Sequence, residues 1–169
     1  MLKKRIIFTL LYDDGTFKLS RNFRLQSIGD INWLLYNYGF GNISFHIDEL
    51  ILLNVSKLES TFPSFVSVLE SLSKYCFAPV AAGGNIRTLS HAKQLLNAGA
   101  DKVVLNTSLI LNQKLVHSIG QHFGRQSIIG SLDVIKKKDS SYVLYNPNIE
   151  NKSLIKLDNF LYSLPQELI

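Results

Sequence analysis

The chain has 169 residues, 46% of them hydrophobic and 18% charged, which is typical of one folded domain with a sizeable core and excludes a disordered or collagen-like protein. The 18 Lys and Arg that give a formal net charge of +5 are dispersed, apart from residues 3–5 and 136–138, and this argues against a nucleic-acid partner. One cysteine, Cys76, excludes an intrachain disulfide, and neither a signal peptide nor a membrane-spanning run is evident, so we expect a cytoplasmic protein with no membrane contact.

Short β-rich runs alternate with segments of helical periodicity along the whole chain. Asp30 and Thr88 stand where they would cap predicted helices, and Gly39, Gly99 and Gly124 stand where helices would end. The predicted strands are residues 5–11, 49–55, 79–82, 102–105, 127–134 and 142–145. The predicted helices are residues 30–38, 63–75, 89–97, 112–123 and 153–161.

The predicted strands are nearly continuous apolar runs, and most are followed by a helix. This pattern favours a parallel sheet covered by helices, which is the α/β class. No Gly-x-Gly-x-x-Gly follows the first strand and no Walker motif is present, which weighs against dinucleotide-binding and nucleotide-hydrolysing folds. In a barrel of this class the chemistry lies at the carboxyl ends of the strands.

Two predicted strands end in groups that suit an anion. Gly83, Gly84 and Asn85 follow the third strand, where small residues let backbone N–H groups approach a phosphate. A tight turn that needs positive φ is the alternative. Asn106 and Thr107 end the next strand, where helix capping is the alternative. Because phosphate sites on such barrels are built from neighbouring loops, we expect one shared phosphate site.

Asp133 ends the apolar run 128–132, where a partly desolvated carboxylate would suit general acid or base catalysis. A salt bridge to Lys136 is the alternative. The four histidines lack metal-ligand spacing, and no nucleophile elbow or Ser, His and Asp arrangement is present. We therefore expect neither a metal site nor a cofactor.

Three charged residues stand at the opposite, amino ends of their predicted strands. They are Arg5, Glu49 and Lys102. If the strands are neighbours in a barrel, these side chains meet at its lower mouth and can pair. A network that only stabilises the fold is the alternative.

Five segments in unbroken order, MLKKRII, DELILLNV, PVAAGGNIRT, NAGADKVVLNTS and FGRQSIIGSLDV, resemble the cyclase subunit of imidazole glycerol phosphate synthase, the HisF family, over residues 1–135. The resemblance implies a TIM-barrel-like (βα)8 fold that receives ammonia from a glutaminase partner along its axis. It implies an ammonia gate at Arg5, Glu49 and Lys102, and a glutaminase contact at Asp101.

The same resemblance implies phosphate binding by the glycine loop, Asn106 and Thr107, with Asn85 where a third glycine is usual. It implies that Asp133 is one of two catalytic aspartates. The other is Leu11 here, and Asn54 stands where the family carries aspartate. Leu11 cannot move a proton, although closing an imidazole ring needs proton transfer at two sites.

These departures, together with Leu10-Leu11 and the lysine run after SLDV, are similar to a paralogous branch associated with amidation of an N-acetylated sugar in surface-polysaccharide synthesis. That branch implies a glutaminase partner and a phosphorylated or nucleotide-linked substrate. Two alternatives stay open. One is imidazole glycerol phosphate synthesis itself, in histidine biosynthesis. The other is a catalytically degenerate partner protein that only activates a glutaminase.

A complete (βα)8 barrel takes about 200–250 residues. The predicted elements supply only its first five βα units, so we expect residues 1–169 to form a single partial barrel domain. Such a half barrel would leave its first and fifth strands as open edges, through which it could associate with another copy.

Overall fold

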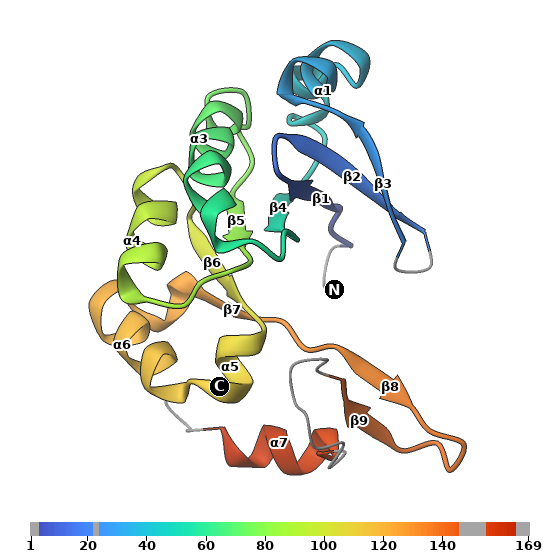
Figure 1. The fold of residues 1–169 in the computed structure, drawn as a ribbon, viewed down its shortest axis with the longest axis vertical. Coiled ribbons are helices and arrows are strands. Elements are labelled where there is room, and N and C mark those ends of the chain that lie inside the picture. Colours follow the sequence, from blue (N-terminus) through green and yellow to red (C-terminus); the bar gives the residue numbers. More distant parts are fainter. Residues whose placement is uncertain (1–3, 22–23, 146–154, 165–169) are drawn as a thin grey trace. The chain divides into compact units, whose positions relative to one another are not determined.

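The computed structural model describes residues 4–21, 24–145 and 155–164. The chain divides into two compact units, Met1–Val104 and Leu105–Ile169. Each unit has its own elements and is described by itself (Figure 1). The prediction of a single domain over residues 1–169 stays a prediction.

The first unit is built on a sheet in the strand order β3-β2-β1-β4-β5-β6. Its helices and strands are β1 (Ile7–Asp13), β2 (Thr16–Arg21), β3 (Arg24–Gly29), α1 (Ile31–Asn37), α2 (Phe40–Ile43), β4 (Glu49–Asn54), α3 (Phe62–Ser73), β5 (Val80–Gly83), α4 (Leu89–Asn97) and β6 (Lys102–Leu105). Strands β1, β4, β5 and β6 run parallel. The α/β prediction is therefore confirmed.

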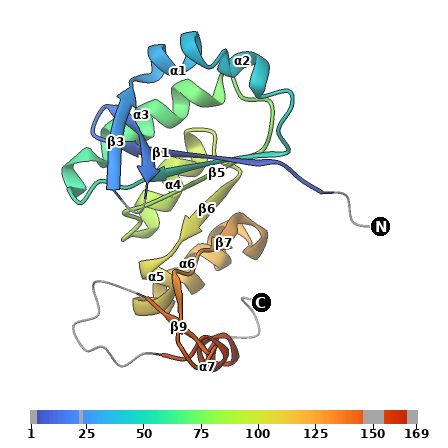
Figure 2. The same ribbon diagram turned by 90° about the vertical axis from the view of Figure 1, so that its right-hand side faces the viewer.

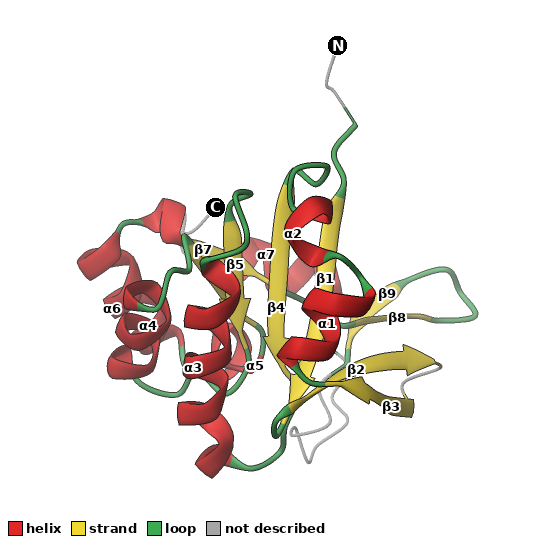
Figure 3. Cartoon of the chain, turned by 90° about the horizontal axis from the view of Figure 1, so that it is seen from above, coloured by secondary structure: helices red, strands yellow, loops and turns green. Residues whose placement is uncertain are grey.

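Helices α1, α2 and α3 lie on one side of β1 and β4 (Figures 2 and 3). The strand side chains that face them are fully buried, among them Leu50 and Leu52. On α3 an apolar stripe supplies Phe65, Leu69 and Leu72, which are also fully buried. Each such side chain contributes about 1.5–3 kcal/mol to folding, so this layer holds the sheet in place.

Two predicted helix starts are confirmed by their caps. The Asp30 carboxylate accepts a hydrogen bond from Trp33 N at 2.8 Å. The Thr88 hydroxyl accepts one from His91 N at 3.2 Å. Each cap satisfies a backbone N–H that has no partner inside its helix.

The hairpin β2–β3 was not predicted. Its segments carry few apolar residues, and Leu19 and Leu25 are exposed, so no hydrophobic periodicity marked them. The sequence signal in this region, Asp14-Gly15, belongs to the turn that joins β1 to β2, and its φ angles of 41° and 84° are those of a tight hairpin turn. The expected open edge of the first strand is also partly wrong, because β2 pairs with β1 over residues 11–13.

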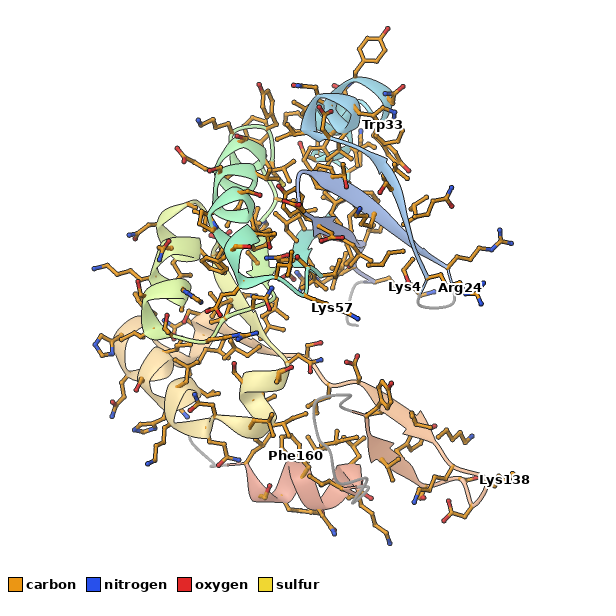
Figure 4. All side chains as sticks on the ribbon, in the orientation of Figure 1. Lys4, Arg24, Trp33, Lys57, Lys138 and Phe160 are labelled. Carbon is orange, nitrogen blue, oxygen red and sulfur yellow. The ribbon has the colours of Figure 1, made fainter. Side chains whose placement is uncertain are left out.

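The second unit contains α5 (Thr107–Leu111), α6 (Gln113–Phe123), β7 (Ile128–Gly130), β8 (Val134–Lys136), β9 (Tyr142–Leu144) and α7 (Leu157–Ser163). Ser131 N donates to Leu105 O, at the end of β6, at 2.8 Å. Strands β8 and β9 form an antiparallel hairpin with Lys138 at its exposed turn (Figure 4).

Several boundaries in this unit differ from the prediction. The strand expected over 127–134 is the short β7, because the chain leaves the strand at Ser131 and starts β8 at Val134. Asn112 caps α6 instead of belonging to it. The last helix begins at Leu157, and residues 153–154 of the predicted helix lie outside the described residues.

None of the helices in the described ranges combines the length and the apolar character that crossing a bilayer requires.

Candidate functional site

An ion triplet lies at the amino ends of the parallel strands. The Glu49 side chain is buried and accepts a hydrogen bond from Arg5 Nη2 at 3.0 Å through Oε2. Its other oxygen, Oε1, lies 3.5 Å from Lys102 Nζ. The structure therefore brings together the three charged residues that the sequence placed at the lower mouth, with Glu49 as the shared acidic partner.

Asp101 lies beside this triplet, directly before Lys102. Its Oδ2 accepts a hydrogen bond from Val80 N at 2.8 Å, at the start of β5. The bond aligns the amino ends of β5 and β6. Asp101 also lines a hollow of about 250 Å³ together with Ser73, Cys76 and Phe77. Asp101 thus stabilises the pairing of β5 with β6 and also borders the hollow.

The glycine loop at the carboxyl end of β5 is packed against neighbouring backbone. A Cβ on Gly83 would lie 2.4 Å from Val104 O, and a Cβ on Gly84 would lie 2.0 Å from Asn54 O. Gly84 also has φ of 98°. Both glycines are therefore required by close approach, and at Gly84 the positive φ of the tight-turn alternative is present as well.

Asn85 takes the position of the third glycine because it tolerates the backbone conformation there. Its φ is 56°, in the left-handed region that Asn adopts more readily than most residues. Its Nδ2 donates to Ser56 O at 2.8 Å. Asn85 O lies 3.1 Å from His91 Nδ1, whose ring stacks on Phe62 with centroids 4.3 Å apart. The loop is thus fixed by Asn85 where a glycine would leave it free.

The glycine loop does not lead straight into a helix. Residues 84–88 separate Gly83 from α4, and Thr88 caps that helix. Arg87 Nη1 lies 3.2 Å from Glu59 Oε2. Gly83 and Gly84 therefore lie apart from the first turn of α4, which has its own cap.

In the second unit, Asn106 and Asp133 are partners. Asn106 Nδ2 donates to Asp133 Oδ2 at 3.1 Å, and Asp133 O accepts from Tyr145 N at 2.8 Å. Asn106 makes no side-chain cap for α5, which begins at Thr107, so the capping alternative is wrong for it. The partner of the Asp133 carboxylate is this amide, and among the described residues Asp133 forms no salt bridge with Lys136.

Asp133 is exposed, which corrects the expectation of a desolvated carboxylate. The reason is the early end of β7: Asp133 lies in the link between β7 and β8 and does not end a buried strand. Gly83, Gly84 and Asn85 belong to the first unit, and Asn106, Thr107 and Asp133 belong to the second. One phosphate site shared by these loops stays a prediction.

The sequence did not single out Asn54 as a buried polar group. Asn54 is 5% exposed at the end of β4, and its Oδ1 accepts from Ser56 N at 3.1 Å. Its Nδ2 has no hydrogen-bond partner in the described structure. Leu11, half-buried, lies opposite Leu53 on β4. Leu11 therefore packs beside an apolar residue, where a carboxylate would lose solvation without gaining a partner from Leu53.

Among residues 4–21, 24–145 and 155–164, no three His, Cys, Asp or Glu side chains are placed to hold a metal ion. Cys76 Sγ donates weakly to Ala78 O at 3.5 Å. Burial raises the pKa of the Cys76 thiol, and the Asp101 carboxylate adds to this, against the lowering by the Ala78 hydrogen bond.

Comparison with known proteins gives a family match over most of the chain. Residues 43–161 match the profile of the family described as histidine biosynthesis protein. A relative from Parasynechococcus marenigrum (strain WH8102), named as imidazole glycerol phosphate synthase subunit hisF2, is 45% identical over 167 residues, or 98% of this chain and 62% of the relative.

Two further relatives have similar names. A hisF2 subunit from Campylobacter jejuni is 34% identical over 158 residues, covering 93% of this chain and 62% of its own length. The subunit HisF of imidazole glycerol phosphate synthase from Staphylococcus epidermidis is 35% identical over 144 residues, covering 82% and 54%. The chain thus spans 54 to 62% of the length of these curated relatives.

Proposed function

Because the chain belongs to the histidine biosynthesis protein family and is similar to subunits named HisF, we propose that it serves in the cytoplasm as the ammonia-accepting, cyclase-type subunit of a glutamine amidotransferase complex. Its partner in this proposal is a glutaminase subunit. The ammonia enters between the amino ends of the parallel strands and reacts at their carboxyl ends.

The ion triplet carries this proposal. Glu49 is buried, whereas Arg5 and Lys102 are partly exposed, so a charged and movable group lies on each side of a fixed carboxylate. Such an arrangement can close the mouth to water and ions, and it can open by movement of one lysine.

The sheet face above the triplet supports the same proposal. Side chains two residues apart on a strand share a face. Lys102 therefore shares its face with Ala81 and Ile51, through the register between β4, β5 and β6. The next row is Leu53, Gly83 and Val104. This apolar surface suits neutral ammonia and disfavours ammonium, because an unpaired charge would be desolvated there.

We assign the substrate's phosphate to the backbone around Gly83, Gly84 and Asn85 and to Asn106 and Thr107. The substrate is phosphorylated or nucleotide-linked. Asp133 is the proton-transferring group, and Asn106 positions its carboxylate from 3.1 Å. No metal or cofactor takes part in this proposal.

We propose amidation of an N-acetylated sugar for surface-polysaccharide synthesis as the reaction. Leu11 can neither accept nor donate a proton. In this step an amidotransferase partner activates the carbonyl oxygen of the acetamido group as a leaving group, ammonia adds to the carbonyl carbon, the activated oxygen departs, and an amidine forms. No ring is closed, so the second ring-closing proton transfer of imidazole formation is not required.

The second candidate is imidazole glycerol phosphate synthesis, which the names of the relatives favour. It requires a group that replaces the function of the missing carboxylate at Leu11. Complementation of a histidine auxotroph by the chain would favour this candidate over sugar amidation.

The decisive experiment reconstitutes the chain with the glutaminase subunit and the amidotransferase from its source organism and supplies the N-acetylated sugar, ATP and [amide-15N]glutamine. We expect 15N to appear in a sugar amidine, and Asp133→Asn to lower its formation at least 100-fold, as for removal of a general acid or base. The matched control is Asp158→Asn, which changes an exposed aspartate of the same unit. Glutaminase activation with no labelled product would instead identify a degenerate partner.

The gate has its own test. We expect Lys102→Ala to uncouple the complex, so that glutamine is hydrolysed and less than half of the ammonia appears in product. Ammonia supplied in the medium should restore synthesis. Unchanged coupling in this variant would remove the gate from the proposal and leave the triplet as a structural network.

A further inference from the structure

One ring nitrogen of His91 lies against both a hydrogen-bond acceptor and a hydrogen-bond donor. His91 Nδ1 is 3.1 Å from Asn85 O, and Arg87 N directs its hydrogen at the same nitrogen from 3.4 Å. A protonated Nδ1 can donate to Asn85 O, whereas an unprotonated Nδ1 can only accept from Arg87 N. Neither distance is short for a hydrogen bond, so the ring lies between its two partners. The position of one proton therefore decides which of the two contacts is a hydrogen bond.

The rest of His91 is held in place. Its backbone N donates to Thr88 Oγ1 at 3.2 Å, in the cap of α4. Its ring stacks on Phe62, the first residue of α3, with centroids 4.3 Å apart and planes 23° apart. Phe62 is itself buried and tightly packed. Because the backbone and the ring plane are both fixed, the proton on Nδ1 is the part of His91 that can change without rearranging the fold.

The glycine loop, residues 83–87, is tied down by side chains on its other side. Asn85 Nδ2 donates to Ser56 O at 2.8 Å, and Arg87 Nη1 lies 3.2 Å from Glu59 Oε2. Ser56 and Glu59 both belong to the stretch between β4 and α3. The side chains of Asn85 and Arg87 are thus already engaged, and His91 Nδ1 acts on their backbone groups.

Resting on the proposed function, in which the glycine loop holds the substrate's phosphate, we propose that His91 is a positioning residue that adapts this loop to the anion. Without the anion the ring carries its proton on Nε2, and Nδ1 accepts from Arg87 N. A phosphate oxygen then takes the Arg87 N–H, because a hydrogen bond to a charged acceptor is stronger than one to a neutral ring nitrogen. The ring proton moves from Nε2 to Nδ1 through water, and Nδ1 donates to Asn85 O. The ring keeps one proton throughout, so its charge does not change.

The exchange of partners removes a repulsion that phosphate binding would otherwise create. Once the Arg87 N–H has turned to the anion, an unprotonated Nδ1 would present its lone pair to those of Asn85 O. A proton on Nδ1 replaces this repulsion by a hydrogen bond, and it keeps the carbonyl oxygen directed at His91 and away from the anion. Arg87 is exposed and His91 is half-buried, so phosphate and water both have access.

The first test records the 15N signals of the histidine rings in the full chain, with and without inorganic phosphate as the probe. We expect phosphate to move the His91 Nδ1 signal from the unprotonated to the protonated range, and the Nε2 signal in the opposite direction. Both nitrogens in the protonated range would identify an imidazolium and overturn the proposed exchange. His122 is the internal reference, since its Nδ1 lies 2.9 Å from Ser118 O, and its signals should not change.

The affinity for inorganic phosphate gives a second readout. His91→Phe keeps a ring that can stack on Phe62 but removes both ring nitrogens, and we expect it to raise Kd about five- to tenfold. His91→Asn places an amide where Nδ1 stood, and its Kd should stay within about twofold of wild type because the amide can donate to Asn85 O. His122→Phe is the matched control and should leave Kd unchanged. Thermal unfolding of each variant checks that the fold is retained.

The outcomes separate this inference from the function on which it rests. Wild-type affinity in His91→Phe, or His91 signals that stay constant while phosphate binds, would overturn the positioning role and leave the proposed phosphate site intact. Equal losses in His91→Phe and His91→Asn would contradict the proton exchange, because the amide variant would then not restore the bond to Asn85 O. No binding of phosphate by the wild-type chain would overturn both the phosphate assignment and this inference.

Discussion

Glu49 and Lys102 form their ion pair across a strand that lies between them. Lys102 begins β6 and Glu49 begins β4, and β5 separates the two strands. The residue of β5 that pairs with Lys102 is Ala81. Because Ala81 has the smallest chiral side chain, the lysine stem can extend over it towards Glu49, and Nζ reaches Oε1 at 3.5 Å. An ion pair between adjacent strands would not have to cross an intervening side chain.

The first prediction concerns the stability of the ion triplet. We expect Lys102→Met to lower the free energy of unfolding by about 1 kcal/mol, because the buried Glu49 carboxylate loses one of two cations. The Lys102 side chain is 37% exposed, which keeps the effect modest. Arg5→Met should cost less, since Arg5 is 55% exposed. Urea denaturation measures both, and a larger loss in Arg5→Met would contradict the assigned order.

The second prediction concerns the glycine loop. Gly84→Ala should cost about 2–4 kcal/mol, because it combines a positive φ with a steric clash against Asn54 O. Gly15→Ala, with positive φ and open space, should cost about 1 kcal/mol. Gly41→Ala has neither feature and should be neutral or slightly stabilising. Equal midpoints of thermal unfolding in the three variants would refute this ranking.

The third prediction concerns Asn85. We expect Asn85→Ala to destabilise the chain by about 1–2 kcal/mol, because alanine loses the bond to Ser56 O and adopts positive φ less readily. Asn85→Gly relieves the backbone but loses the same bond, so its cost should be smaller. Chemical denaturation of both variants separates the backbone contribution from the hydrogen bond. A glycine variant less stable than the alanine variant would contradict this account.

The fourth prediction follows from the Cys76 thiol, whose pKa burial raises above its ordinary value of 9.0. Alkylation by iodoacetamide should therefore need a higher pH in the folded chain than in urea. A folded-state pKa above the unfolded value gives stability that is fully present below the unfolded pKa. That contribution is lost as pH rises through the folded pKa. Asp101→Asn should shift the alkylation profile to lower pH, and an unshifted profile would exclude Asp101 as a cause.

Local patterns in the sequence determined α1, α3, α4 and the parallel strands of the first unit, whereas the short helix α2 was not predicted. Asp30 and Thr88 cap helices where predicted, because a capping side chain bonds to backbone only a few residues away. The strand 102–105 was predicted without error, since its apolar run is bounded by charged and polar residues. Arg5, Glu49 and Lys102 each stand at the amino end of a predicted strand, so the sequence also predicted that they lie at one end of the sheet.

Only the tertiary structure decided features that depend on contacts between distant segments. The hairpin β2–β3 has too little apolar pattern to be predicted, and it forms by pairing with β1. The exposure of Asp133 follows from where β7 ends, and its partnership with Asn106 joins residues 27 positions apart. The stacking of Phe45 on Phe77 results from two loops that meet because β4 and β5 pair. Helix caps and hydrophobic periodicity depend on residues close together in the sequence and can be predicted from it. Strand register and packing between loops depend on distant segments and are decided only when the chain folds.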